Sequence, residues 1–122
     1  MTVRQAIDRL QARKPHQYGD ETAAGWLSDL DGRLYANYCL GHEGMESLAH
    51  GPYTADADDA ELMVKEPYTD LYIRYMAAQV DYYNAEFARY NNSMVMYNMM
   101  LAEYANWINR THMPEQRATL KL

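Results

Sequence analysis

Apolar residues recur every three or four positions in two stretches of the first 40 residues, a spacing that predicts two helices. Thr2 is a good N-cap for a helix that reaches about Lys14, where Pro15 ends it. Asp20 is expected to cap a second helix that runs to about Leu40. The apolar positions are Val3, Ala6, Ile7 and Leu10 in the first helix, and Trp26 or Leu27, Leu30, Leu34 and Tyr38 in the second.

Helical spacing stops after residue 40. The segment Gly41–Glu66 contains three glycines, Pro52 and the acidic run Asp56–Asp59, which together are typical of a loop. We interpret it as an irregular loop. A short β-hairpin, with strands near Leu48 and at Leu62–Val64, is the alternative.

The longest regular stretch begins at Pro67, a residue suited to the first position of a helix, and meets no further Pro or Gly before Pro114. The cluster Asn91–Ser93 divides it, because Asn and Ser compete for backbone hydrogen bonds. We therefore expect two helices of about 20 residues in an antiparallel hairpin, with a turn at this cluster. One continuous helix is the alternative. The two apolar series are Tyr72, Met76, Val80, Tyr83, Phe87 and Tyr90, then Met94, Tyr97, Leu101, Tyr104 and Ile108.

The expected fold class is thus all-α: a small helical bundle dominated by the C-terminal hairpin at 67–111, with two helices in 1–40, a loop at 41–66 and an arm at 112–122. Each hairpin helix carries a second apolar row, and packing within a hairpin satisfies only one row. The second rows predict a subunit interface at Leu71, Tyr75, Tyr82, Met96, Met100 and Trp107. In the alternative, the first two helices cover these rows and the chain is a monomeric four-helix bundle.

Composition supports one folded domain. The chain has 122 residues, of which 48% are hydrophobic and 23% charged. A net charge of −6 disfavours nonspecific binding to DNA or to anionic membranes, and no stretch is apolar enough to span a membrane. With a lone cysteine and no leader pattern, cytosolic synthesis is expected. Twelve Tyr and nine Met suit protein contacts, or equally a core built from these residues.

The sequence offers little chemistry. No phosphate-binding glycine motif occurs, and His42, Glu43 and Glu46 lack the second histidine of a zinc-protease helix. The acidic run departs from a calcium loop at its sixth and twelfth positions. Cys39 and His42 could meet on one helical face, but a buried structural thiol is the simpler interpretation. We therefore expect no metal, no cofactor and no enzymatic activity.

Three segments carry a resemblance to a known family: Glu66–Tyr75, Asp81–Ser93 and Trp107–His112. They resemble small proteins encoded beside the capsid genes of tailed phages and prophages, the head-tail connector or adaptor proteins. The stretch Trp26–Arg33 resembles the second helix of the same group. The resemblance covers most of the chain and weakens between Gly41 and Asp59 and after Pro114.

The resemblance implies a structural virion protein without a reaction. Its subunits form a homo-oligomeric ring, typically of twelve copies, at the neck of the virion between the portal protein and a tail-side neck or stopper protein. Such a ring extends the DNA channel, and DNA passes through without specific binding. In that setting Asp56, Asp58 and Asp59 would repel DNA from the channel or face the portal, although a solvated loop explains them equally well. A cytosolic helical scaffold or regulator, and a small enzyme with its site at Cys39, His42 and Glu43, are the alternatives.

Overall fold

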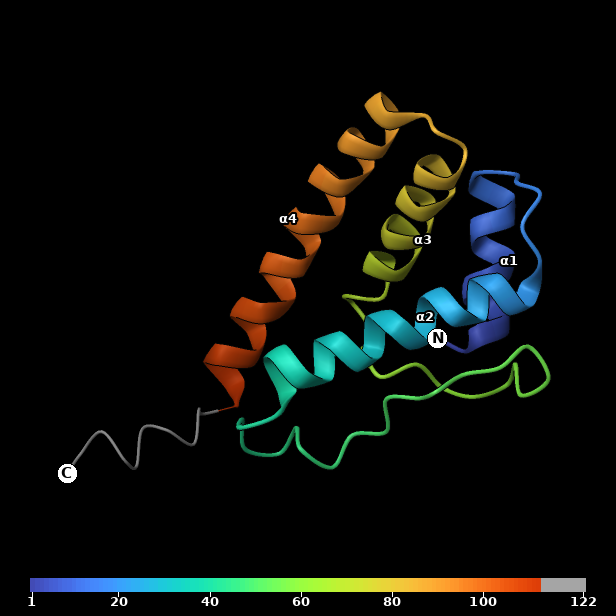
Figure 1. Ribbon diagram of the computed structural model, residues 1–122. Coiled ribbons are helices and arrows are strands. Elements are labelled where there is room, and N and C mark those ends of the chain that lie inside the picture. Colours follow the sequence, from blue (N-terminus) through green and yellow to red (C-terminus); the bar gives the residue numbers. More distant parts are fainter. Residues whose placement is uncertain (113–122) are drawn as a thin grey trace.

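A computed structural model describes residues 1–112, so residues 113–122, and with them most of the expected C-terminal arm, lie outside the described part. The chain is all-α, as predicted (Figure 1). Its elements are the helices α1 (Val3–Arg13) and α2 (Asp20–Leu34), the π-helix η1 (Tyr35–Cys39), and the helices α3 (Asp70–Tyr83) and α4 (Phe87–Thr111).

The two N-terminal helices form where the apolar spacing places them. The Thr2 side chain caps α1 and Gln5 closes a reciprocal capping box. Asp20 is the first residue of α2, and Gly19 rather than Asp20 is the N-cap. The expected run to Leu40 is continuous in space, but its last turn, η1, widens to π-helical hydrogen bonding.

The segment between η1 and α3 contains no named strand within the described residues, and Glu61 of this segment forms an isolated bridge with Thr2. The irregular-loop interpretation is therefore confirmed over the β-hairpin. Pro67 does not begin a helix: it lies in a turn closed by the Tyr68 amide on the Lys65 carbonyl (3.0 Å), and α3 starts three residues later, at Asp70.

The C-terminal hairpin is present, but its turn lies at residues 84–86 instead of at Asn91–Ser93. The connection is closed by hydrogen bonds from the Ala85 amide to the Tyr82 carbonyl (3.0 Å) and from the Glu86 amide to the Asp81 carbonyl (2.9 Å). The Asn91–Ser93 cluster lies inside α4, where the Ser93 hydroxyl donates to the buried Asp81 carboxylate (3.0 Å). This tertiary hydrogen bond offsets the weak helix preference of the cluster.

Helix α3 is the centre of the molecule, with α4 on one side and α1 and α2 on the other (Figure 1). Most of its circumference is therefore buried. Among the named elements of residues 1–112, α4 packs only on α3 and η1, so most of its surface is left outward. No helix in this part of the chain has both the length and the apolar content needed to cross a membrane.

Candidate interaction surfaces

Two of the six residues predicted to face another subunit are buried inside this one. Leu71 is fully buried and Tyr75 is 7% exposed, because α2 and α4 cover the α3 row on which they lie. The Tyr75 ring packs on the Tyr97 ring (centroids 5.3 Å apart), and the Arg33 guanidinium both lies over it and donates a hydrogen bond to its hydroxyl. The prediction for Leu71 and Tyr75 is therefore wrong.

The other four predicted residues retain solvent exposure. Tyr82 and Met96 are exposed, while Met100 and Trp107 are half-buried. Tyr82 belongs to the same α3 row as Tyr75, but it lies next to the last residue of the helix and is 49% exposed. Among the described residues, the exposed large apolar side chains lie at the end of the hairpin and along α4, with Leu40 the one outside these two places.

The end of the hairpin carries an aromatic cluster, here called the aromatic tip: Tyr82, Tyr83, Phe87 and Tyr90. Tyr82 is its hub, with ring centroids 5.3 Å from Tyr83, 6.1 Å from Phe87 and 5.4 Å from Tyr90. Below the tip, Trp26 of α2 stacks on Tyr83 at 6.1 Å and holds the tip against the first half of the chain. Tyr82, Tyr83 and Phe87 nevertheless remain 49%, 59% and 57% exposed.

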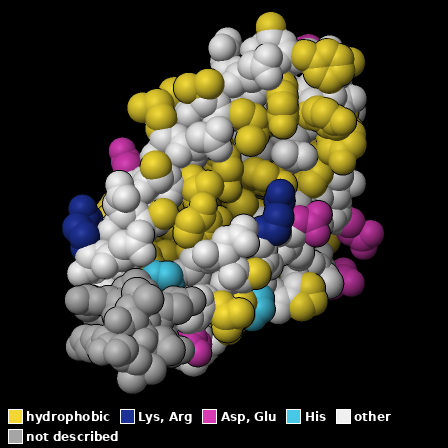
Figure 2. Space-filling view, turned by 60° about the vertical axis from the view of Figure 1, so that its left-hand side comes forward, with side chains coloured by type: hydrophobic (Ala, Val, Ile, Leu, Met, Phe, Trp, Pro, Cys, Tyr) yellow, Lys and Arg dark blue, Asp and Glu magenta, His cyan; other side chains and the backbone are white. Residues whose placement is uncertain are grey.

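The outward side of α4 forms a second apolar surface, the outer stripe, made of Val95, Met96 and Met99. Val95 and Met99 lie on the side of α4 opposite Tyr97, which faces the core, and Met96 lies on the flank, about 100° around the helix from Tyr97. Figure 2 views the molecule from the side of α4 and shows hydrophobic side chains over its upper part and in a central trough.

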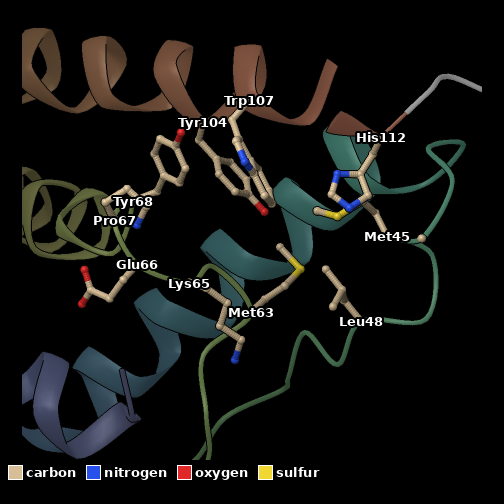
Figure 3. A pocket seen from close by; sticks show the side chains of 11 residues that line it. Met45, Leu48, Met63, Lys65, Glu66, Pro67, Tyr68, Tyr104, Trp107 and His112 are labelled. Carbon is tan, nitrogen blue, oxygen red and sulfur yellow. The ribbon is translucent and has the colours of Figure 1, made fainter. Parts of the chain in front are cut away.

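An apolar pocket of about 270 Å³ lies near the other end of α4. Tyr104 and Trp107 of α4 form one wall, and Met45, Leu48 and Met63 of the loop face them across the opening, as Figure 3 shows. Lys65, Glu66 and His112 also line the pocket. The three rings of Tyr68, Tyr104 and Trp107 lie within 6 Å of one another, which keeps this wall rigid. The pocket suits one large apolar side chain.

Sequence reasoning missed a buried polar centre at Asp31 of α2. Its carboxylate, fully shielded from water, accepts hydrogen bonds from the Tyr53 hydroxyl (2.5 Å), the Tyr72 hydroxyl (2.7 Å) and the Met63 amide (3.1 Å). Burial raises the pKa of Asp31, and the hydrogen bonds from Tyr53 and Tyr72 oppose that rise. The centre fastens the loop to α2 and α3. The feature of the sequence that could have revealed this centre is the position of Asp31 within the apolar stripe of the second helix.

The candidate nucleophile has the wrong surroundings for catalysis. Cys39 is fully buried, and burial raises the pKa of its thiol, which keeps it protonated. Its sulfur lies 3.9 Å from the Met63 sulfur. His42 instead pairs with the Asn109 side chain (3.0 Å). Within residues 1–112, no three His, Cys, Asp or Glu side chains gather as metal ligands would.

The acidic loop residues do not act as a single surface. Asp58 is half-buried and pairs with Arg4 (3.2 Å), whose guanidinium also binds Asp20 (2.7 Å). Asp56 and Asp59 are exposed. The Asp58 carboxylate is thus already committed within the chain, whereas Asp56 and Asp59 are open to solvent.

No family model, curated protein or solved structure matches this chain.

Proposed function

We propose that this chain is a structural subunit that assembles with other copies of itself, and that the assembly is a head-tail connector ring between the portal and the tail of a bacteriophage virion. The observation that carries the proposal is apolar surface at the aromatic tip and the outer stripe that the chain leaves uncovered. The virion setting rests on the resemblance of segments such as Asp81–Ser93 to connector proteins.

The exposed area is large enough to matter. Tyr82, Tyr83 and Phe87 are each about half exposed, and at roughly 200 Å² per aromatic side chain they leave about 300 Å² in water. One side of a standard interface covers about 800 Å², of which about 450 Å² is apolar. The tip alone supplies about two-thirds of that amount, and the outer stripe adds to it. The largest apolar patch of a typical monomer measures about 300 to 600 Å² and is often functional, so the tip and the stripe together are candidates for a contact surface.

The charge of the chain suits a passage for DNA. With a net charge of −6, a ring of copies repels the phosphate backbone, so that DNA slides through without binding. Asp56 and Asp59, which are exposed, are the loop residues proposed to face the channel or the portal, with Asp58 held beside Arg4. Reversing the charge of Asp56 and Asp59 should slow DNA ejection, and an unchanged ejection rate would reject this role.

The test of the proposed function is incubation with purified portal protein followed by sedimentation velocity and electron microscopy. A connector binds the portal as a ring. A cytosolic scaffold or regulator, the alternative proposal, has no reason to bind it. Absence of a complex with portal from the same genome would reject the connector role. A matched binding control is the variant Met99→Ser, which should weaken ring formation while leaving the fold intact, because Met99 of the outer stripe is 58% exposed.

A further inference from the structure

We propose that Phe87 of one copy inserts into the apolar pocket of a second copy, so that the aromatic tip and the pocket are the two halves of one head-to-tail contact. The inference rests on the proposed self-assembly and names the residues that make it. Phe87 is the knob, and the pocket walled by Met45, Leu48, Met63, Tyr104 and Trp107 is the hole.

The knob cannot fill the hole of its own chain. Phe87 opens α4, whereas Tyr104 and Trp107 lie 17 and 20 residues further along the same helix, so that about 25 to 30 Å separates them along the axis. A contact between these sites must join two copies. Because the two patches differ, the contact is heterologous and leaves a free knob and a free hole at the ends of any short chain of copies. Such a contact builds a ring where the rotation between neighbouring copies closes, and an open filament where it does not.

The Phe87 side chain and the pocket match in size and chemistry. Phe87 is the single Phe of the chain and is 57% exposed, although Phe is normally a core residue. A pocket of about 270 Å³ is below the usual size of a small-molecule site but accepts one phenyl ring. Met45 and Met63 line it, and thioether sulfurs make favourable contacts with aromatic rings and adapt to their shape.

The charges at the edges also match. Beside the knob, Glu86 and Arg89 form an exposed pair (3.1 Å), and the pocket lining includes Lys65 and Glu66. Docking then places Glu86 of one copy against Lys65 of the other, and Arg89 against Glu66. Lys65 remains mostly exposed; its ammonium donates to the Leu62 carbonyl (3.0 Å) and lies 3.9 Å from Glu61, and such exposed contacts cost little to exchange on docking.

The first experiment measures self-association of the full chain by sedimentation velocity over a range that reaches about 1 mM. The variant Phe87→Ser should weaken association about 30-fold or more, as truncation of a central interface anchor does. The matched control is Leu40→Ser, because Leu40 is 56% exposed, carries an apolar side chain and belongs to neither the aromatic tip, the outer stripe nor the pocket. It should change association less than threefold. An equal effect of the two variants would show that losing any exposed apolar side chain weakens association, and would overturn the inference.

The second experiment swaps charges. Glu86→Lys and Lys65→Glu should each weaken association, and combining both in one chain should restore it, because the pair is re-formed across the contact with reversed polarity. Circular dichroism checks that each variant folds. A double variant no stronger than the singles, or a wild-type chain that stays monomeric at 1 mM, would overturn the proposal.

The two proposals fail separately. If the wild-type chain binds the portal but Phe87→Ser assembles normally, the knob-and-hole contact is wrong and the connector role stands. If the chain self-associates through Phe87 but ignores the portal, the contact stands and the connector role is wrong.

Discussion

The buried centre at Asp31 gives the sharpest test of how this fold is held together. Tyr72 is fully buried, and its hydroxyl donates to the Asp31 carboxylate (2.7 Å) while accepting from the Val64 amide (2.7 Å). The variant Tyr72→Phe removes this one oxygen and keeps the ring. It therefore deletes a hydrogen bond to a charged group and leaves the Val64 amide without a partner in a buried setting.

The expected change in the free energy of unfolding follows from those two losses. A hydrogen bond to a charged group is worth about 1.5 to 3 kcal/mol, and an unsatisfied buried amide costs about 1 to 3 kcal/mol. Part of the loss overlaps, so the free energy of unfolding should fall by about 3 kcal/mol out of a total on the order of 10 kcal/mol for 122 residues. At this chain length the melting temperature should fall by about 12 °C.

Urea unfolding followed by circular dichroism, with calorimetry as a second probe, measures both quantities. The control is Tyr83→Phe, which removes the same oxygen from a ring that is 59% exposed and should change stability by less than about 0.5 kcal/mol. If the free energy of unfolding of Tyr72→Phe is within about 0.5 kcal/mol of the wild-type value, the Asp31 centre does not fasten the loop and the reasoning is refuted.

Three further perturbations probe the same framework. Burial raises the pKa of Asp31 above its ordinary value of 3.8, so between these two pKa values the folded state binds more protons than the unfolded state. The free energy of unfolding should therefore fall as pH rises from about 4 through the raised pKa. Asp31→Asn should remove this slope in urea titrations from pH 4 to 7, and an unchanged slope contradicts the assignment. Lys14→Met leaves the buried carboxylate of Asp81 without its cation at 2.6 Å and should destabilise the chain by about 3 kcal/mol; no loss of denaturation midpoint would show that Ser93 suffices. Thr2→Ala breaks the capping box with Gln5 and should cost about 1 kcal/mol by the same assay, with a loss below about 0.3 kcal/mol arguing that the cap is unimportant.

The site could be predicted from the sequence only in part. The second apolar rows correctly indicated excess hydrophobic surface on the hairpin, and Tyr82 and Met96 are indeed exposed. Leu71 and Tyr75 have the same spacing and residue types, yet they are buried, because α2 crosses that part of α3. Helical spacing in the sequence indicates which residues share a face. How far along the helix that face is covered depends on the neighbouring elements.

The pocket and the Asp31 centre were out of reach for another reason. Each joins side chains from distant segments: the pocket links Met45 and Met63 with Trp107, and the centre links Asp31 with Tyr53 and Tyr72. An isolated Asp or Met in a sequence has no periodic partner that would mark it. Only the path of the loop beneath α2 brings these groups together (Figure 1).

What the sequence by itself determined is the helical class and the placement of α1 and α2, because apolar spacing and the Thr2 cap act within a few residues of one another. The tertiary structure alone decided where the hairpin turns and which apolar rows stay open. Local preference favoured a turn at Asn91–Ser93, but the Ser93 hydroxyl gains a partner in buried Asp81 only when that segment is helical, and the chain reverses at 84–86 instead. The physical reason is that a local preference of a few tenths of a kcal/mol per residue is outweighed by one satisfied buried carboxylate.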